Sequence, residues 1–174
     1  PEKLELKQDI FRRVAAVVEE DCLIATNTSS LSVTDLGSVV PSPERFLGLH
    51  FFNPPPLMKL LEVVRSAVTS EATVSRALEL AERMGKTPIV VADAPGFASS
   101  RLGVTLGLEA IRMVEEGVAS PADIDTAMEL GYRHPMGPLK LTDLVGLDVR
   151  LHISEYLAEK LDDTRFQAPE LMRR

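Results

Sequence analysis

The chain has 174 residues, of which 45% are apolar, and a formal net charge of −7. This length suits one domain or two small ones, and the apolar fraction can form a sizeable core. The acidic balance argues against nucleic acid or an anionic membrane surface as the main partner, since both attract basic patches. No apolar run approaches the roughly 18 residues of a membrane span. The single cysteine, Cys22, excludes an internal disulfide framework and fits a reducing compartment such as the cytoplasm.

The first 93 residues are expected to alternate helices and strands. Apolar residues recur at helical spacing over residues 3–20, which predicts an amphipathic helix. Four short apolar runs predict buried strands. These runs are residues 22–26, 46–52, 60–64 and 88–92. Before the last of them, Ser70 is a candidate N-cap of another helix, and Gly85 is its C-terminal stop.

After residue 93 the strand signals disappear. Residues 97–116 form a helical pattern that is apolar on several faces, which is typical of a buried helix. Gly103 and Gly107 permit a close helix–helix approach there, either within the chain or in a homodimer. Ser120 followed by Pro121 resembles another helix start. Further helices are expected near residues 138–146 and 147–162, so the expected domains are residues 1–93 (α/β) and residues 94–174 (all-helical).

Two polar residues interrupt apolar strands, and their spacing suggests a catalytic pair. A buried carboxylate is costly unless it is paired, so Glu62 either faces solvent or has a buried partner. His50 is either a core residue or a catalyst. If the strands around the prolines at 54–56 form an antiparallel hairpin, His50 lies opposite or nearly opposite Glu62 on the same face. The carboxylate would then fix the imidazole tautomer and stabilise the protonated ring, as suits a general base.

Two serines lie where ligands commonly bind. Ser29 follows the end of a buried strand, and ligands of open α/β sheets bind beyond such ends. A plain turn at residues 27–30, or an N-cap for a short helix near residues 32–36, explains the same residues. Ser100 lies in the first turn of the long helix, where free N–H groups suit a carbonyl or an anion, or are simply capped. The sequence contains no G-x-G, no P-loop and no metal-ligand cluster.

Six motifs, in order and with matching spacing, resemble those of the L-3-hydroxyacyl-CoA dehydrogenases. They are residues 27–31 (NTSSL), 50–54 (HFFNP), 58–63 (MKLLEV), 93–97 (DAPGF), 123–128 (DIDTAM) and 135–138 (PMGP). The resemblance covers essentially the whole chain. It implies the second half of a Rossmann-like domain followed by an all-α C-terminal domain, with the N-terminal dinucleotide-binding half missing.

The resemblance also implies roles for the site residues. His50 would remove the proton of the substrate 3-hydroxyl while hydride moves to the nicotinamide of NAD. Glu62 would orient His50 and raise its basicity. Ser29 would lie between the substrate oxygen and the nicotinamide. Ser100 stands where the family commonly has asparagine near the substrate, which puts substrate placement there in question.

The same resemblance implies the partners. NAD would be the cofactor, and Glu2, Lys7, Ser29 and Asn53 match positions at or near it. An acyl-CoA would be the substrate, and the helical domain would form a homodimer. Two other readings stay open at this point. The chain could be a non-catalytic fragment that acts as a helical dimerisation module, or it could belong to another hydroxy-acid dehydrogenase of the same architecture.

Overall fold

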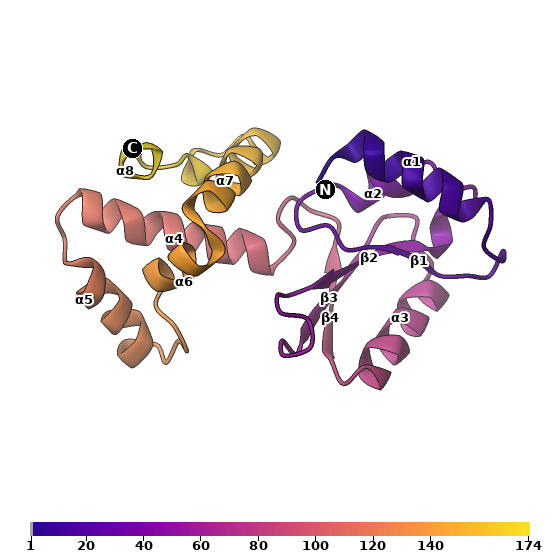
Figure 1. Ribbon diagram of the computed structural model, residues 1–174, viewed down its shortest axis with the longest axis horizontal. Coiled ribbons are helices and arrows are strands. Elements are labelled where there is room, and N and C mark those ends of the chain that lie inside the picture. The colour runs from indigo at the N-terminus through magenta and orange to yellow at the C-terminus, as the bar shows by residue number, and fades with distance from the viewer. Residues whose placement is uncertain (1) are drawn as a thin grey trace. The chain divides into compact units, whose positions relative to one another are not determined.

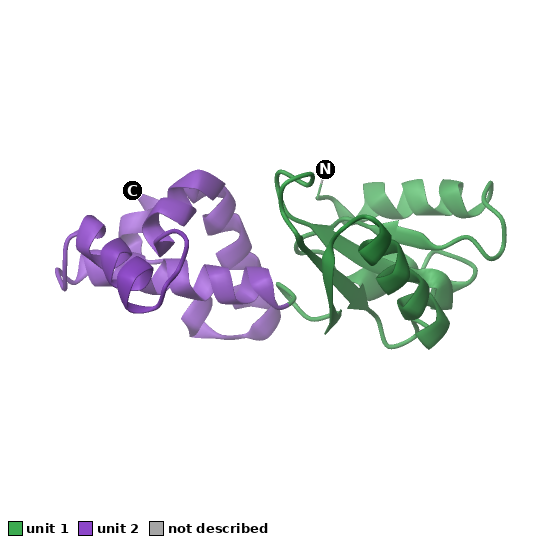
Figure 2. Ribbon diagram, turned by 90° about the horizontal axis from the view of Figure 1, so that it is seen from below, with its two compact units in different colours: residues 1–97 green, residues 98–174 purple. Residues whose placement is uncertain are grey.

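The computed structural model describes residues 2–174. The chain forms two compact units, Pro1–Phe97 and Ala98–Arg174 (Figure 2). The first unit mixes helices and strands, and the second contains helices alone among its described elements (Figure 1). The division lies close to the boundary expected after residue 93. None of the helices within residues 2–174 has the length and apolar character that a membrane span requires.

The first unit is built on a four-stranded sheet in the order β1-β2-β3-β4. The strands are β1 (Ile24–Thr26), β2 (Phe46–Phe51), β3 (Leu60–Arg65) and β4 (Thr87–Ala92). β1 pairs with β2 in parallel, β2 with β3 antiparallel, and β3 with β4 in parallel. All four predicted strands are therefore present, and the predicted hairpin joins β2 to β3.

Helices cover both faces of this sheet. α1 (Leu4–Ala15) and α2 (Val33–Gly37) lie on one face, and α3 (Glu71–Arg83) lies on the other (Figure 1). A short 3-10 helix, η1 (Pro43–Arg45), precedes β2. The predicted cap of α3 is confirmed, since the Ser70 side chain accepts a hydrogen bond from the N–H of Thr73. Two core clusters follow from this layering, one on each face of the sheet.

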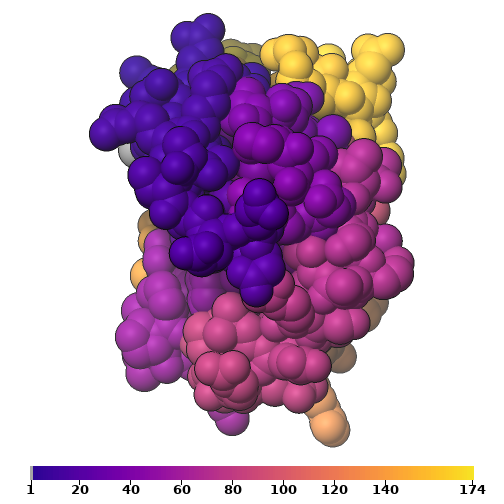
Figure 3. Space-filling model, turned by 90° about the vertical axis from the view of Figure 1, so that its right-hand side faces the viewer, coloured from indigo at the N-terminus to yellow at the C-terminus, as the bar shows by residue number. Residues whose placement is uncertain are grey.

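α1 is shorter than the helix predicted over residues 3–20. It ends at Ala15, and none of its residues is fully buried, so it lies on the surface of its unit (Figure 3). The chain beyond it turns because the Arg45 guanidinium binds main-chain carbonyls there. Its Nη1 donates to the oxygens of Glu19 (2.5 Å) and Glu20 (2.9 Å). A distant side chain therefore satisfies carbonyls that a longer helix would have used.

The second unit packs its helices around one apolar cluster. Its elements are α4 (Ser99–Glu115), α5 (Pro121–Thr126), the π-helical turn η2 (Ala127–Gly131), α6 (Pro138–Val145), α7 (Leu147–Leu161), the 3-10 helix η3 (Thr164–Phe166) and α8 (Glu170–Arg173). Val104, Leu108 and Ile111 of α4 lie in the cluster with Leu157 and Phe166. The predicted helix starts and ends in this half agree with the structure to within a few residues.

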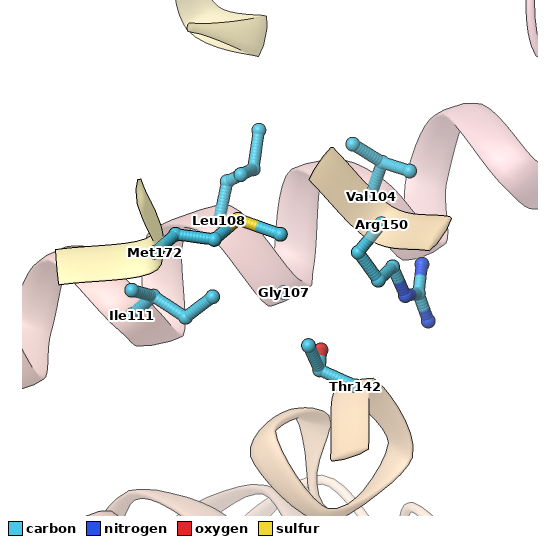
Figure 4. A pocket seen from close by; sticks show the side chains of 7 residues that line it. All are labelled: Val104, Gly107, Leu108, Ile111, Thr142, Arg150 and Met172. Atoms are coloured by element: carbon cyan, nitrogen blue, oxygen red, sulfur yellow. The ribbon is translucent and has the colours of Figure 1, made fainter. Parts of the chain in front are cut away.

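The glycines of α4 serve packing within the unit (Figure 4). A Cβ atom at Gly107 would lie 2.8 Å from Oγ1 of Thr142, and one at Gly103 would lie 3.3 Å from Nη1 of Arg150. α6 therefore approaches α4 at Gly107 more closely than a side chain would allow, whereas at Gly103 the end of the Arg150 side chain would have to shift only slightly. The prediction that α4 is buried nearly all round is wrong, because Leu102 and Leu106 are 66% and 43% exposed. These leucines give the unit an uncovered apolar strip.

Candidate active site

The centre of the candidate site is a buried histidine–glutamate pair. The β2–β3 register places His50 directly opposite Glu62, which confirms the pairing predicted from the hairpin. Nδ1 of His50 lies 2.6 Å from Oε2 of Glu62. His50 is 5% exposed and Glu62 is 0% exposed. The reading in which Glu62 faces solvent is therefore wrong, and the reading that requires a buried partner is correct.

This pair has a defined chemistry. A carboxylate against Nδ1 favours the imidazole tautomer that carries its proton on Nδ1, which leaves Nε2 to accept one. When Nε2 takes a proton, the ring becomes a cation, and Glu62 stabilises that cation. The short contact and the exclusion of water make the stabilisation larger than it would be at the surface. The pair can therefore accept, hold and return a proton at Nε2.

Two aromatic rings lie against the imidazole. The ring centroid of Phe52 is 4.7 Å from that of His50, and the centroid of Phe97 is 5.7 Å from it. Phe97 is 5% exposed and has a left-handed φ of 47°, which is uncommon for a bulky residue. Its N–H donates to the carbonyl of Ala94 at 2.9 Å, which closes the turn that leads from β4. The sequence analysis assigned no role to either phenylalanine.

The segment that follows β1, residues 27–32, is called the serine loop here because it carries Ser29. Its first residue is fixed to β2, since Oδ1 of Asn27 accepts from the N–H of Phe51 at 2.9 Å. Oγ1 of Thr28 then accepts from the N–H of Leu31 at 2.9 Å, which closes a turn. Ser29 lies half-buried within this turn. The segment is thus a turn, as one of the earlier readings had it.

The short helix expected near residues 32–36 is also present, but its cap is not among residues 27–30. α2 begins at Val33, and the Ser32 side chain caps it by accepting from the N–H of Asp35 at 3.1 Å. Asp93, at the end of β4, binds the same helix start. Asp93 belongs to the motif at residues 93–97, but no role was predicted for it, although an acidic residue just after a strand, together with Ser32 and Thr34, is a signal for such a contact.

The residues predicted to contact the cofactor lie at two different places in the first unit. Glu2 lies beside the serine loop, since its Oε2 accepts from Oγ1 of Thr28 at 2.6 Å. Nζ of Lys7 lies 3.2 Å from Oε1 of Glu2. This polar group sits near the carboxyl end of parallel strand β1, where α/β sheets bind nucleotides, and its donors and acceptors suit ribose hydroxyls. Asn53 is exposed at the start of the loop that joins β2 to β3.

Ser100 belongs to the second unit. It is half-buried in the first turn of α4, two residues after Ala98, the N-cap residue, whose own side chain makes no capping hydrogen bond. The first unit thus holds His50, Glu62 and Ser29 on adjoining strands and loops.

The fold and the pair define the class to which this chain belongs. A buried histidine–glutamate pair on an α/β sheet, followed by a helical domain, fits the architecture of an NAD-dependent dehydrogenase. Family models make the assignment specific. The model described as "3-hydroxyacyl-CoA dehydrogenase, NAD binding domain" matches residues 1–94, and the model of the C-terminal domain of that enzyme matches residues 96–174. The chain belongs to the 3-hydroxyacyl-CoA dehydrogenase family.

Individual relatives agree with this assignment. The chain is 43% identical over 171 residues to a 3-hydroxybutyryl-CoA dehydrogenase of Clostridioides difficile, covering 98% of this chain and 61% of the relative. It is 47% identical over 147 residues to the mitochondrial hydroxyacyl-coenzyme A dehydrogenase of Sus scrofa, covering 84% of this chain and 47% of the relative. The crystal structure of (S)-3-hydroxybutyryl-CoA dehydrogenase from Ralstonia eutropha matches with a TM-score of 0.95 at 41% identity, over 99% of this chain and 61% of that one.

These matches refine two expectations. The expected fold is supported as a Rossmann-like NAD-binding domain followed by a helical C-terminal domain. The expectation that the dinucleotide-binding half is missing was wrong as stated, because the model of the NAD-binding domain matches residues 1–94. The chain carries both domains and spans 61% of the length of the two bacterial relatives named above. NAD is the cofactor that this family membership implies.

Proposed function

We propose that the full-length protein oxidises 3-hydroxyacyl-CoA thioesters to 3-oxoacyl-CoA thioesters. The observation that carries this proposal is the buried contact of 2.6 Å between His50 and Glu62. Similarity to the 3-hydroxybutyryl-CoA dehydrogenases named above supports a short-chain substrate such as 3-hydroxybutyryl-CoA. NAD, when bound, supplies the acceptor for the hydride that leaves C3 of the substrate.

In this proposal His50 is the general base. Its Nε2 takes the proton from the 3-hydroxyl as the C3–O bond becomes a carbonyl, and a base of this kind contributes roughly 10²- to 10⁴-fold to the rate. Glu62 stabilises the imidazolium that forms. Phe52 and Phe97 keep water away from the ring. Ser29 donates a hydrogen bond to the substrate oxygen from the serine loop.

Further residues complete the proposed site. Glu2, Lys7 and Asn53 contact the cofactor together with Ser29, and the ion pair between Glu2 and Lys7 holds the carboxylate beside the serine loop. Ser100 contributes a hydroxyl from the first turn of α4 to substrate placement. A serine reaches less far than the asparagine common in the family, so the substrate carbonyl near it would be held by a shorter donor.

We also propose that the helical unit forms a homodimer. Two leucines of α4, Leu102 and Leu106, are 66% and 43% exposed. Other exposed apolar residues of the unit include Leu144 (72%) and Leu147 (46%). Apolar surface of this extent commonly marks a protein–protein contact.

The test of the reaction is a substrate comparison. NADH formation, followed by absorbance, would be measured for the full-length protein with 3-hydroxybutyryl-CoA and with free 3-hydroxybutyrate. The proposal expects turnover of the thioester and little turnover of the free acid. A preference for the free acid would instead support another hydroxy-acid dehydrogenase of this architecture. Lack of turnover with every thioester and acid would favour a non-catalytic role.

A further inference from the structure

The carboxylate of Asp93 accepts four hydrogen bonds from the start of α2. Oδ1 accepts from the N–H of Val33 at 3.0 Å, and Oδ2 accepts from the N–H of Thr34 at 2.7 Å. Oδ2 also accepts from Oγ1 of Thr34 at 2.6 Å and from Oγ of Ser32 at 3.1 Å. Asp93 is itself fixed to the sheet, because its N–H donates to the carbonyl of Arg65 at 2.9 Å. All four donors are uncharged, so the contact depends on the geometry of its hydrogen bonds and not on attraction between opposite charges.

This contact fixes the far end of the serine loop. The loop begins at Asn27, which is bound to Phe51 of β2, and it ends at Ser32, which is bound to Asp93. Ser29 lies between these two attachments. A loop of six residues that is held at both ends has little freedom, so the position of the Ser29 hydroxyl depends on both attachments.

Asp93 also begins the turn that places Phe97. The turn is closed by the hydrogen bond from Phe97 to Ala94, and the Phe97 ring then lies 5.7 Å from the ring of His50, centroid to centroid. The left-handed φ of Phe97, 47°, persists only where the surroundings hold it. Asp93 is therefore connected to two segments: its carboxylate binds the end of the serine loop, and its main chain leads into the turn that places Phe97 against His50.

We infer that Asp93 is a positioning residue, which sets the Ser29 hydroxyl and the Phe97 ring around His50. It touches neither substrate nor cofactor in this scheme. The effect on turnover rests on the dehydrogenase function proposed above. The effect on the geometry around His50 does not, so the two can be tested apart.

The diagnostic substitution is Asp93→Asn. The main-chain N–H groups of Val33 and Thr34 go to different oxygens, and an asparagine offers only one acceptor oxygen. Whichever way the amide turns, one N–H faces an NH₂ group. Displacement of about 1 Å in a site can cost as much as 10²-fold, so kcat of the full-length protein should fall roughly 10- to 100-fold. The matched control is Asp35→Asn, an exposed residue of α2 that loses the same charge and should stay within about twofold.

A double substitution separates positioning from general stability. If Asp93 acts mainly through Ser29, the loss caused by Asp93→Asn should shrink to about threefold in a Ser29→Ala background, because the hydroxyl to be positioned is gone. Multiplication of the two separate losses would overturn the inference. Both variants would be assayed well below their melting temperatures, so that loss of folded protein does not enter kcat.

A structural readout tests the geometry without turnover. In Asp93→Asn the NMR shifts of the His50 ring protons should move, because the Phe97 ring current changes, and they should stay in place in Asp35→Asn. If the wild type oxidises no 3-hydroxyacyl-CoA while these shifts still move, the proposed function fails and the positioning role stands. Unmoved shifts together with a kcat like that of the control would overturn the inference.

A milder variant covers the case in which Asp93→Asn does not fold. Thr34→Val removes only the hydroxyl bond to Asp93 and keeps the main-chain N–H bond. One lost hydrogen bond corresponds to roughly a threefold loss in kcat, with a ring shift at His50 in the same direction. If Thr34→Val matched Asp35→Asn in both measurements, the inference would be overturned.

Discussion

Each unit of the molecule buries a carboxylate, and the two carboxylates have different partners. In the α/β unit Glu62, which is 0% exposed, meets the imidazole of His50. In the helical unit Asp125 is 3% exposed and accepts from two main-chain N–H groups, those of Leu139 at 2.8 Å and Lys140 at 3.0 Å. Main-chain N–H groups do not titrate, whereas an imidazole does. The partner of a buried carboxylate, rather than its burial, therefore decides whether the carboxylate can assist proton transfer, as proposed for Glu62, or serves only as a cap.

Asp125 has a clear structural task. It caps the start of α6, whose own N-cap position is Gly137 and provides no side chain. The carboxylate lies so close that a Cβ atom at Gly137 would be 2.3 Å from it. The glycine and the aspartate are therefore a matched set, and neither of them is available for chemistry.

Among the substitutions that test this contrast, the replacement of His50 should have the largest effect on kcat. Replacement by alanine in the full-length protein should lower kcat at least ~10²-fold, because the general base is removed. The measurement is steady-state NADH formation with 3-hydroxybutyryl-CoA. His152→Ala is the matched control, since His152 is exposed on α7 and should leave kcat unchanged. A near-normal kcat for His50→Ala would refute the assignment of the base.

Glu62→Gln should have the next largest effect. The amide keeps the shape of the side chain but no longer stabilises a protonated ring, so kcat should fall roughly 10- to 100-fold, the usual cost of losing an orienting partner. The pH dependence of kcat/KM should also change, because the imidazole loses its charged hydrogen-bond partner. An unchanged profile would place Glu62 with Asp125, as a structural residue.

The sequence predicts the surroundings of one of the two buried carboxylates and not of the other. Glu62 could be singled out because it interrupts an apolar strand, and the hairpin spacing then supplied His50 as its partner. The four strands and the main helices could also be predicted, since hydrophobic period is a local signal. Asp125 could not be singled out as a buried cap, because it lies in a polar helix start and its burial depends on α6, fourteen residues further along the chain.

Contacts between residues far apart in the sequence also explain the other differences between prediction and structure. α1 ends early because Arg45, far along the chain, binds the carbonyls after it. The contact between Asp93 and the start of α2 was not predicted, because the four donors lie about sixty residues before Asp93 in the sequence. Long-range contacts of this kind leave no periodic pattern, so only the fold reveals them.

Asp125→Asn should affect stability and leave chemistry alone. Its two oxygens each accept one main-chain N–H, and asparagine can accept only one of them, so the free energy of unfolding should fall by about 1–3 kcal/mol. Urea unfolding measures this loss. The control Asp123→Asn, at an exposed residue of the same helix, should cost less. A large fall in kcat of the folded Asp125→Asn variant would break the distinction between the two carboxylates.

The smallest effect concerns a half-buried carboxylate, Glu129, beside the Asp125 cap. A hydrogen bond from Lys140 lowers the pKa of Glu129 from its ordinary value of 4.5, and a main-chain hydrogen bond from Gly137 lowers it further. A lowered folded pKa means that the contribution to stability is fully present above about pH 4.5 and is lost as the pH falls through the folded pKa.

Lys140→Met should therefore raise the pKa of Glu129 toward 4.5 in an NMR titration, and it should flatten the acid dependence of stability in that range. Lys160→Met, at an exposed lysine of α7, is the control and should leave Glu129 unchanged. Because Lys140 is exposed, salt should weaken the wild-type shift. The hydrogen bond to Gly137 should keep part of the shift in Lys140→Met. If Lys140→Met left the Glu129 titration unchanged, the main-chain contact would be the dominant cause, and Glu129 would join Asp125 as a carboxylate held by the backbone.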